Sequence, residues 1–363
     1  MRVAVLGAGH GGTAAAAHLS KMGHEVRLFD KFREVVEPFG VAGSVTLKGV
    51  LGEGVYPIEG AYDRLNEAMR GARLVLVVTP AFAHREIATH MADSLEDGQI
   101  ILLHPGRTGG ALEFRNVLKE KNCGARVFVA EAQTLLYACR KSGPTEVHVM
   151  GVKRRVRVAA LPAEDTARVL ETVSTVFPQF VAAVDVLETS LLNIGAMFHP
   201  APTLLNAGRI EDTKGDFRYY HQGITPGVAR VIEMVDEERV RIASSLGVPA
   251  ISAMDWLMEA YGVKGSSLYE CVQGNAAYAA VKAPGDLNAR YLSEDVPTGL
   301  VPLAALGRIA GVRTPVMDAL IDLASSLHAR DYRSQGRNEA AMGIAGLSKE
   351  GLLRMVREEC GTR

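Results

Sequence analysis

Short runs of β-branched and other apolar residues alternate with segments of helical periodicity through the first half of the chain. Runs of this length, bounded by turn residues, predict buried strands, and their alternation with helices predicts βαβ units and a parallel sheet. The predicted strands are Val3 to Leu6, Glu25 to Phe29, Leu74 to Val78, Ile100 to Leu103 and Val127 to Ala130. The pattern therefore predicts an α/β N-terminal domain with a mostly parallel sheet.

The alternation stops near position 150. Glu146 to Met150 and Val156 to Leu161 are predicted to be strands on either side of a turn at Gly151, which favours an antiparallel hairpin at the far side of the sheet. From Asp185 onward, apolar residues recur at helical spacing, first over residues 186–198 and later over 228–246 and 315–327. We therefore predict an N-terminal domain at 1–184 and an all-α domain at 185–363, with a cleft for a ligand between them.

Charge and composition narrow the class of partner. Lys and Arg number 40 against 41 Asp and Glu, which argues against a nucleic-acid or anionic-membrane surface and favours small-molecule substrates. No segment approaches the roughly 18 apolar residues of a membrane helix, so we expect a cytoplasmic protein. The four cysteines form no CxxC pair, which indicates no structural zinc, no disulfide framework and a reducing compartment; they are Cys123, Cys139, Cys271 and Cys360.

A glycine-rich turn follows the first predicted strand. It spans Gly7-Ala8-Gly9-His10-Gly11-Gly12, satisfies the GxGxxG pattern, and leads directly into an alanine-rich helix. In a dinucleotide site Gly7 permits the tight turn, Gly9 lets the backbone approach the pyrophosphate, and Gly12 lets the helix pack on the strand. His10 lies within the same turn. Asp30, at the end of the second strand, is placed to accept the ribose hydroxyls. Strand, turn, helix and acid together predict a Rossmann dinucleotide-binding domain.

Several cofactors use this fingerprint. A flavin is the competing ligand, but it usually prefers glutamate at the end of the second strand and needs a second motif that the chain does not show. Asp30 repels a 2′-phosphate, whereas Lys31 and Arg33 attract one, so NAD is the first choice and NADP the alternative. Thr79 and Pro80 follow the strand from Leu74, at the sheet edge that binds ligands in such folds, and we expect them beside the nicotinamide.

Hydride transfer to a C=O or C=N group needs a proton donor with a pKa near the working pH, and histidine is the natural candidate. His199 is unusual among the ten histidines because it ends an apolar helical stretch at the start of the second domain. Arg290 and Asp295 lie in a segment punctuated by Pro and Gly that we expect to be irregular. Arg290 is suited to clamp a carboxylate and Asp295 to orient an imidazole, although a surface ion pair is the alternative reading.

At these residues the sequence resembles the opine dehydrogenase family, the octopine and nopaline dehydrogenase-like proteins, over essentially its whole length. The most specific stretches are Gly109 to Arg115, His199 to Ala207, Tyr269 to Asn275 and Glu294 to Leu303. The resemblance implies a Rossmann domain plus an all-α opine-dehydrogenase domain. It also implies that an L-amino acid condenses with a 2-oxo acid such as pyruvate, and that NADH or NADPH reduces the imine.

By the same resemblance His199 corresponds to the general acid/base, Asp295 to its partner carboxylate, and Arg290 to a contact with the substrate carboxylate. Gln133 and Thr134 fall near the contacts of the oxo acid. A homodimer is a further possibility. Two alternatives remain open: a reductase of simple 2-oxo acids that forms no carbon–nitrogen bond, and a catalytically silent module that senses dinucleotides. The sequence does not specify which amino acid is used.

Overall fold

The computed structural model describes residues 1–358 of the chain, so Cys360 lies outside the described residues. The described residues form two compact units, Met1–Thr189 with 354–358 as the first and Ser190–Leu353 as the second. The predicted boundary between 184 and 185 precedes helix α7 (Val186–Leu191), whereas the units divide within that helix. Arg357, near the end of α19 (Lys349–Arg357), donates to Asp185 with an Nε–Oδ2 distance of 2.9 Å, and this ion pair lies within the first unit.

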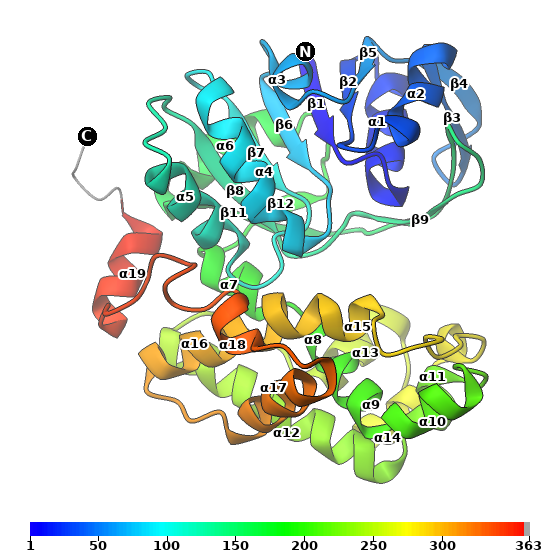
Figure 1. The fold of residues 1–363 in the computed structure, drawn as a ribbon, viewed down its shortest axis with the longest axis vertical. Helices are drawn as coiled ribbons and strands as arrows, with labels where there is room; N and C mark the ends of the chain where they lie inside the picture. Colours follow the sequence, from blue (N-terminus) through cyan, green and yellow to red (C-terminus); the bar gives the residue numbers. More distant parts are fainter. Residues whose placement is uncertain (359–363) are drawn as a thin grey trace. The chain divides into compact units, whose positions relative to one another are not determined.

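An eight-stranded sheet organises the first unit (Figure 1), with the order β12-β11-β8-β7-β6-β1-β2-β5. All of its pairs are parallel except β8 with β11. The predicted mostly parallel sheet is therefore confirmed. Its strands are β1 (Arg2–Leu6), β2 (Glu25–Phe29), β5 (Gly60–Tyr62), β6 (Leu74–Val77), β7 (Ile100–Leu103), β8 (Phe128–Ala132), β11 (Val156–Leu161) and β12 (Phe180–Ala182).

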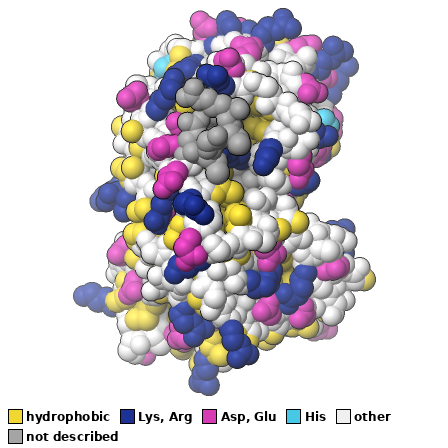
Figure 2. All heavy atoms as spheres, turned by 90° about the vertical axis from the view of Figure 1, so that its left-hand side faces the viewer, with side chains coloured by type: hydrophobic (Ala, Val, Ile, Leu, Met, Phe, Trp, Pro, Cys, Tyr) yellow, Lys and Arg dark blue, Asp and Glu magenta, His cyan; other side chains and the backbone are white. Residues whose placement is uncertain are grey.

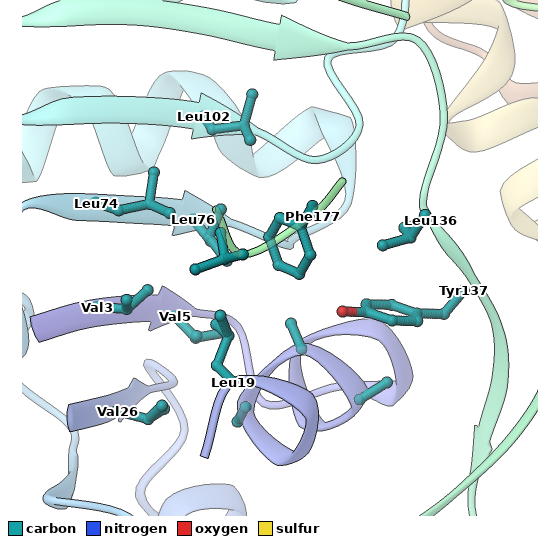
Figure 3. Close-up of a cluster of buried hydrophobic side chains, with 14 of the residues drawn as sticks. Val3, Val5, Leu19, Val26, Leu74, Leu76, Leu102, Leu136, Tyr137 and Phe177 are labelled. Atoms are coloured by element: carbon teal, nitrogen blue, oxygen red, sulfur yellow. The ribbon is translucent and has the colours of Figure 1, made fainter. Parts of the chain in front are cut away.

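The central strands are continuous apolar runs because both faces of the sheet are covered. One face, shown in Figure 3, carries Val3 and Val5 of β1 against Leu19 of α1 (His10–Lys21). The four consecutive alanines from Ala14 to Ala17 are fully buried, and such small side chains allow α1 to pack closely on the strands. This packing fixes the start of α1 at the carboxyl end of β1.

A second, four-stranded sheet was not foreseen from the sequence. Its order is β4-β3-β10-β9, and its strands are β3 (Ser44–Gly49), β4 (Gly54–Pro57), β9 (Tyr137–Lys141) and β10 (Glu146–Val152). The predicted hairpin of β10 with β11 is wrong, because β10 pairs with β3 and β9, whereas β11 joins the larger sheet. Gly151 lies at a bulge in β10 rather than in a hairpin turn, so the local turn signal did not determine the pairing.

Helices complete the first unit. They are α2 (Arg33–Ala42), α3 (Leu65–Met69), α4 (His84–Met91), α5 (Gly110–Glu120) and α6 (Thr166–Val173), with α1, α7 and the end of α19. Short 3₁₀ turns occur at η1 (Ala81–Ala83), η2 (Ala92–Ser94) and η3 (Ala163–Asp165).

The second unit is helical, as predicted, with one isolated bridge between Arg218 and Lys282. Its elements are α8 (Gly195–Phe198), α9 (Pro200–Leu205), α10 (Ala207–Thr213), α11 (Tyr219–Gly223), α12 (Pro226–Leu246), α13 (Ala253–Tyr261), α14 (Leu268–Gln273), η4 (Ala276–Tyr278), α15 (Arg290–Ser293), η5 (Val296–Leu300), α16 (Val301–Ala310), α17 (Pro315–His328) and α18 (Tyr332–Gln335). The predicted continuous helix over 186–198 is wrong, because the helix is interrupted between the end of α7 at Leu191 and the start of α8 at Gly195. Pro200 then starts α9, so His199 occupies the junction between α8 and α9.

On the face drawn in Figure 2, Lys and Arg side chains lie among Asp and Glu side chains rather than in a patch of one sign. Within residues 1–358, no helix combines the length and apolarity needed to cross a membrane.

Candidate functional site

The glycine turn has the geometry that its sequence predicts. Gly7 has a φ of 103°, and a Cβ atom there would lie 2.7 Å from the carbonyl oxygen of Val78. A Cβ atom at Gly12 would lie 1.6 Å from the carbonyl oxygen of Gly7, so α1 can start here only with glycine. A Cβ atom at Gly9 would meet nothing within 4 Å. Two glycines thus shape the turn, and the third keeps the space above it open.

The start of α1 fits the pyrophosphate of a dinucleotide. Gly9 caps the helix without a side chain, and no acidic residue occupies the first turn, so the first amides of α1 can face an anion. His10, the first residue of the helix, is exposed. Asp30 accepts hydrogen bonds from the amides of Ala8 (Oδ2, 2.9 Å) and Phe32 (Oδ1, 3.2 Å). These bonds fix the carboxylate beside the turn, where its remaining lone pairs suit ribose hydroxyls.

Thr79 and Pro80 lie on the neighbouring strand end, as predicted. The Cγ2 atom of Thr79 would lie 2.8 Å from a Cβ atom at Gly7, so its side chain faces the glycine turn. Its Oγ1 atom is buried and makes no hydrogen bond to the described residues. Pro80 caps the 3₁₀ turn η1. A buried hydroxyl that lacks a protein partner beside this turn is consistent with a polar ligand group, and the residues of this edge therefore fit a dinucleotide.

Gln133 and Thr134 follow β8 in the same unit and are both half-buried. The side-chain Oε1 atom of Gln133 accepts a hydrogen bond from the backbone amide of Arg157 at 3.0 Å. The backbone amide of Gln133 donates to the carbonyl oxygen of Arg157. The side chain of Gln133 is therefore engaged by β11. The role of both residues as contacts of an oxo acid stays a prediction.

His199 and Asp295 form a hydrogen-bonded pair in the second unit. The Nδ1 atom of His199 lies 2.8 Å from Oδ2 of Asp295, whose side chain is only 3% exposed, whereas that of His199 is 20% exposed. With the Nδ1 proton donated to the carboxylate, Nε2 is the nitrogen that accepts a proton. This arrangement is that of a general acid/base with an orienting carboxylate.

Three further residues fix His199, and the sequence analysis did not identify them. Thr203 Oγ1 and Tyr219 Oη donate to the carbonyl oxygen of His199 at 2.7 and 2.8 Å. The ring of Tyr291 stacks on the imidazole with a centroid distance of 4.2 Å and an interplanar angle of 11°. Burial raises the pKa of Tyr219 well above its usual value, so its hydroxyl stays protonated and can donate. Of the three, only Thr203 could have been expected beside His199 from the sequence, because it lies four residues later, one turn of a helix away.

Arg290 pairs with Glu294. Its Nε atom donates to Oε2 of Glu294 at 2.5 Å, the arginine side chain is 60% exposed, and the glutamate is buried. The expectation of an irregular segment is wrong, because Arg290–Ser293 forms the short helix α15 and Val296–Leu300 the π-helical turn η5. The i,i+4 spacing of a helix therefore brings Arg290 to Glu294, while Asp295 reaches His199. Such π-turns occur frequently at functional sites.

A row of aromatic rings extends from the imidazole. Tyr219 contacts Tyr291 and Tyr220, and Tyr220 stacks on Tyr278 at a centroid distance of 3.9 Å. The row continues through Tyr261 to Trp256. These side chains come from four elements of the second unit, α11, α13, η4 and α15, so their proximity was not evident from the sequence.

Over the described part of the chain, no group of three or more His, Cys, Asp and Glu side chains is arranged to hold a metal ion. Cys123, Cys139 and Cys271 are free thiols.

A parallel sheet with a glycine turn and acid, followed by a helical unit with a paired histidine, defines an NAD(P)-dependent dehydrogenase of the two-domain type. The family described as NAD-dependent glycerol-3-phosphate dehydrogenase N-terminus matches residues 2–112, and that described as NAD/NADP octopine/nopaline dehydrogenase, alpha-helical domain, matches residues 182–328. An opine dehydrogenase of Arthrobacter sp. (strain 1C) is 41% identical over 96% of this chain and 97% of its own. The chain belongs to the opine dehydrogenase family.

Solved structures agree on the fold. Octopine dehydrogenase with NADH and L-arginine matches with a TM-score of 0.81 at 23% identity, covering 97% of this chain and 98% of that one. Yersinopine dehydrogenase with NADP⁺ bound matches with a TM-score of 0.77 at 16% identity, covering 98% and 99%. The predicted class is confirmed: the chain is an NAD(P)-dependent oxidoreductase of the opine dehydrogenase type, which condenses an amino acid with a 2-oxo acid reductively.

Proposed function

We propose that this enzyme joins an apolar L-amino acid to a small 2-oxo acid such as pyruvate, with His199 as the general acid/base. The observation that carries the proposal is the hydrogen bond between His199 and the buried carboxylate of Asp295, within a chain of this family. The reduced cofactor, when its pyrophosphate is bound along Gly7 to Gly12, supplies the hydride that reduces the imine.

His199 moves the protons of the condensation. Its Nε2 atom first accepts a proton from the substrate ammonium, because only the free amine attacks the oxo carbon. The protonated imidazole then donates to the hydroxyl of the carbinolamine, so that water leaves and the imine forms. Asp295 stabilises the imidazolium and fixes the tautomer, and the stacked ring of Tyr291 limits rotation of the imidazole.

The substrates carry carboxylates and, for the amino acid, a side chain. We assign Arg290 to the oxo-acid carboxylate, supported by its exposed guanidinium and its position five residues before Asp295. Gln133 and Thr134 are weaker candidates for the same substrate. The accessible members of the aromatic row support an apolar amino acid side chain, since Tyr261 is exposed and Tyr291 and Trp256 are partly exposed.

A crossed panel of oxo acids and amino acids, followed by the absorbance of the reduced cofactor, tests the proposal. Turnover should require both substrates and should be fastest with unbranched apolar amino acids. Equal turnover without any amino acid would instead identify a simple 2-oxo acid reductase. Cofactor binding with no turnover on any mixture would identify a dinucleotide sensor. A His199→Ala variant with the parent rate would refute the role of the histidine.

Two properties stay predictions. Assembly as a homodimer is testable by light scattering, and a location in the cytoplasm by fractionation of the source cell.

A further inference from the structure

Strand β9 of the smaller sheet ends beside the glycine turn. Lys141 is its last residue, and its amide donates to Nδ1 of His10 at 3.1 Å. Two residues earlier, Cys139 Sγ lies 3.4 Å from the carbonyl oxygen of His10. Because His10 is the first residue of α1, these contacts hold the end of β9 against the start of the cofactor-binding helix.

The ammonium group of Lys141 reaches Ala8, the turn residue whose amide binds Asp30. Its Nζ atom is 3.3 Å from the carbonyl oxygen of Ala8 and 4.9 Å from the ring centroid of Phe39. The amide of Ala8 donates to Asp30, so the cation and the carboxylate bind opposite ends of one residue in the turn. Partial burial lowers the pKa of Lys141, while the charge of Asp30 acts in the opposite direction.

A cation at this turn changes how the site treats a 2′-phosphate. An acid at the end of the second strand repels that group and favours NAD. Of the basic residues that the sequence suggested as counter-charges, Lys31 pairs with Glu86, with Nζ 3.0 Å from Oε2. Lys141 reaches the glycine turn from the smaller sheet and has three ammonium donors, so it can keep its bond to Ala8 and contact a phosphate as well.

We propose that Lys141 sets the cofactor preference of this enzyme: its ammonium contacts the 2′-phosphate of NADPH and offsets the repulsion from Asp30, so that the site binds NADPH as well as NADH. The proposal rests on the cofactor site alone. It is tested by binding without substrates, so its failure is distinguishable from failure of the amino-acid reaction proposed above.

The experiment compares Lys141→Met, which removes the charge at similar length, with Lys141→Arg, which keeps it. Dissociation constants for NADPH and NADH are measured by fluorescence titration of the reduced nicotinamide. We expect Lys141→Met to weaken NADPH about tenfold and NADH no more than about twofold, and Lys141→Arg to retain NADPH binding. The loss for NADPH should shrink as salt is added. Lys48→Met, an exposed change of the same kind in the same sheet, should alter neither constant.

Equal losses for the two cofactors would overturn the proposal, because Lys141 would then only hold the turn. The proposal would also be overturned if Lys141→Met left both affinities unchanged, or if the parent protein did not bind NADPH. A larger loss of NADPH affinity from Lys31→Met than from Lys141→Met would overturn it as well. If Lys141→Met does not fold, competition by adenosine 2′,5′-bisphosphate and by 5′-AMP against the parent protein decides. At low salt, adenosine 2′,5′-bisphosphate should displace the cofactor at least as well as 5′-AMP does. Its affinity relative to 5′-AMP should fall as the salt concentration rises. A constant preference for 5′-AMP would refute the proposal.

Discussion

His199 Nδ1 lies 2.8 Å from Asp295 Oδ2, although 96 positions separate the two residues along the chain. The carboxylate is almost fully buried, and the imidazole is partly exposed. A buried carboxylate that accepts the Nδ1 proton stabilises the charged imidazole and fixes which nitrogen faces the substrate. The pair therefore has the arrangement that the proposed acid/base role of His199 requires.

Asp295→Asn should lower kcat by about two to four orders of magnitude, because the amide keeps the size of the side chain but no longer stabilises the imidazolium. Cofactor affinity should not change, since the glycine turn belongs to the other unit. Steady-state kinetics and a cofactor titration measure the two effects. Asp216→Asn, an exposed carboxylate of the same unit, serves as the control. A kcat within threefold of the parent value would remove Asp295 from the mechanism.

Arg290→Met should raise the KM for the oxo acid by about tenfold to a hundredfold, because a charge-assisted contact to the carboxylate is lost. The KM of Arg290→Lys for the oxo acid should lie between those of the parent and of Arg290→Met, since an ammonium group does not bind a carboxylate through two parallel donors. The affinity for the cofactor should remain that of the parent. Arg64→Met provides an exposed arginine change as the control. An unchanged KM for every oxo acid would show that Arg290 serves only its ion pair with Glu294.

The glycine turn predicts opposite outcomes for two alanine substitutions. Gly12→Ala should lower the free energy of unfolding by several kcal/mol, on the order of other severe core clashes, because its Cβ would overlap the carbonyl oxygen of Gly7. Gly9→Ala should leave stability unchanged but weaken cofactor binding, because its methyl group enters the space above the turn. Urea unfolding and cofactor titration distinguish the two. Parent-like affinity in Gly9→Ala would place the pyrophosphate elsewhere.

Buried His104 predicts how stability depends on pH. Burial lowers its pKa to about 3, from an ordinary value of 6.5, and its Nε2 atom accepts a hydrogen bond from the amide of Leu136. Below pH 6.5 the unfolded chain therefore binds a proton that the folded chain does not, so stability falls as the pH drops toward 3. The contribution is about 1.4 kcal/mol per pH unit in that window and is absent above it.

Urea midpoints of the parent and of His104→Gln, taken from pH 7 to pH 4.5, test this linkage. The stability difference between the two proteins should narrow as the pH falls, because the glutamine does not titrate. His90→Gln, the same replacement at an exposed site, serves as the control. A constant difference for His104→Gln would mean that His104 takes up a proton in the folded protein.

The sequence identified the parts of the site that depend on local order. Gly7, Gly9, Gly12 and Asp30 follow their strands at fixed spacing, and a strand that leads through such a turn into a helix admits few alternatives. His199 and Asp295 were recognised through resemblance, since apolar periodicity alone gave His199 only a place near a helix end. The hairpin of β10 with β11 failed because a turn residue limits the local backbone but not the choice of partner strand.

By itself, the sequence determined the two-part plan, the parallel sheet and the glycine turn, because these follow from the period of apolar residues and from backbone conformations that only glycine adopts readily. Only the tertiary structure decided that Lys141 reaches Ala8 of the glycine turn, that Tyr291 stacks on His199, and that Arg290 pairs with Glu294. The first two contacts join residues far apart in sequence, and the third depends on a short helix within a Pro- and Gly-rich segment. Packing of whole elements fixes the first two contacts, whereas the third follows from i,i+4 spacing once helix α15 forms.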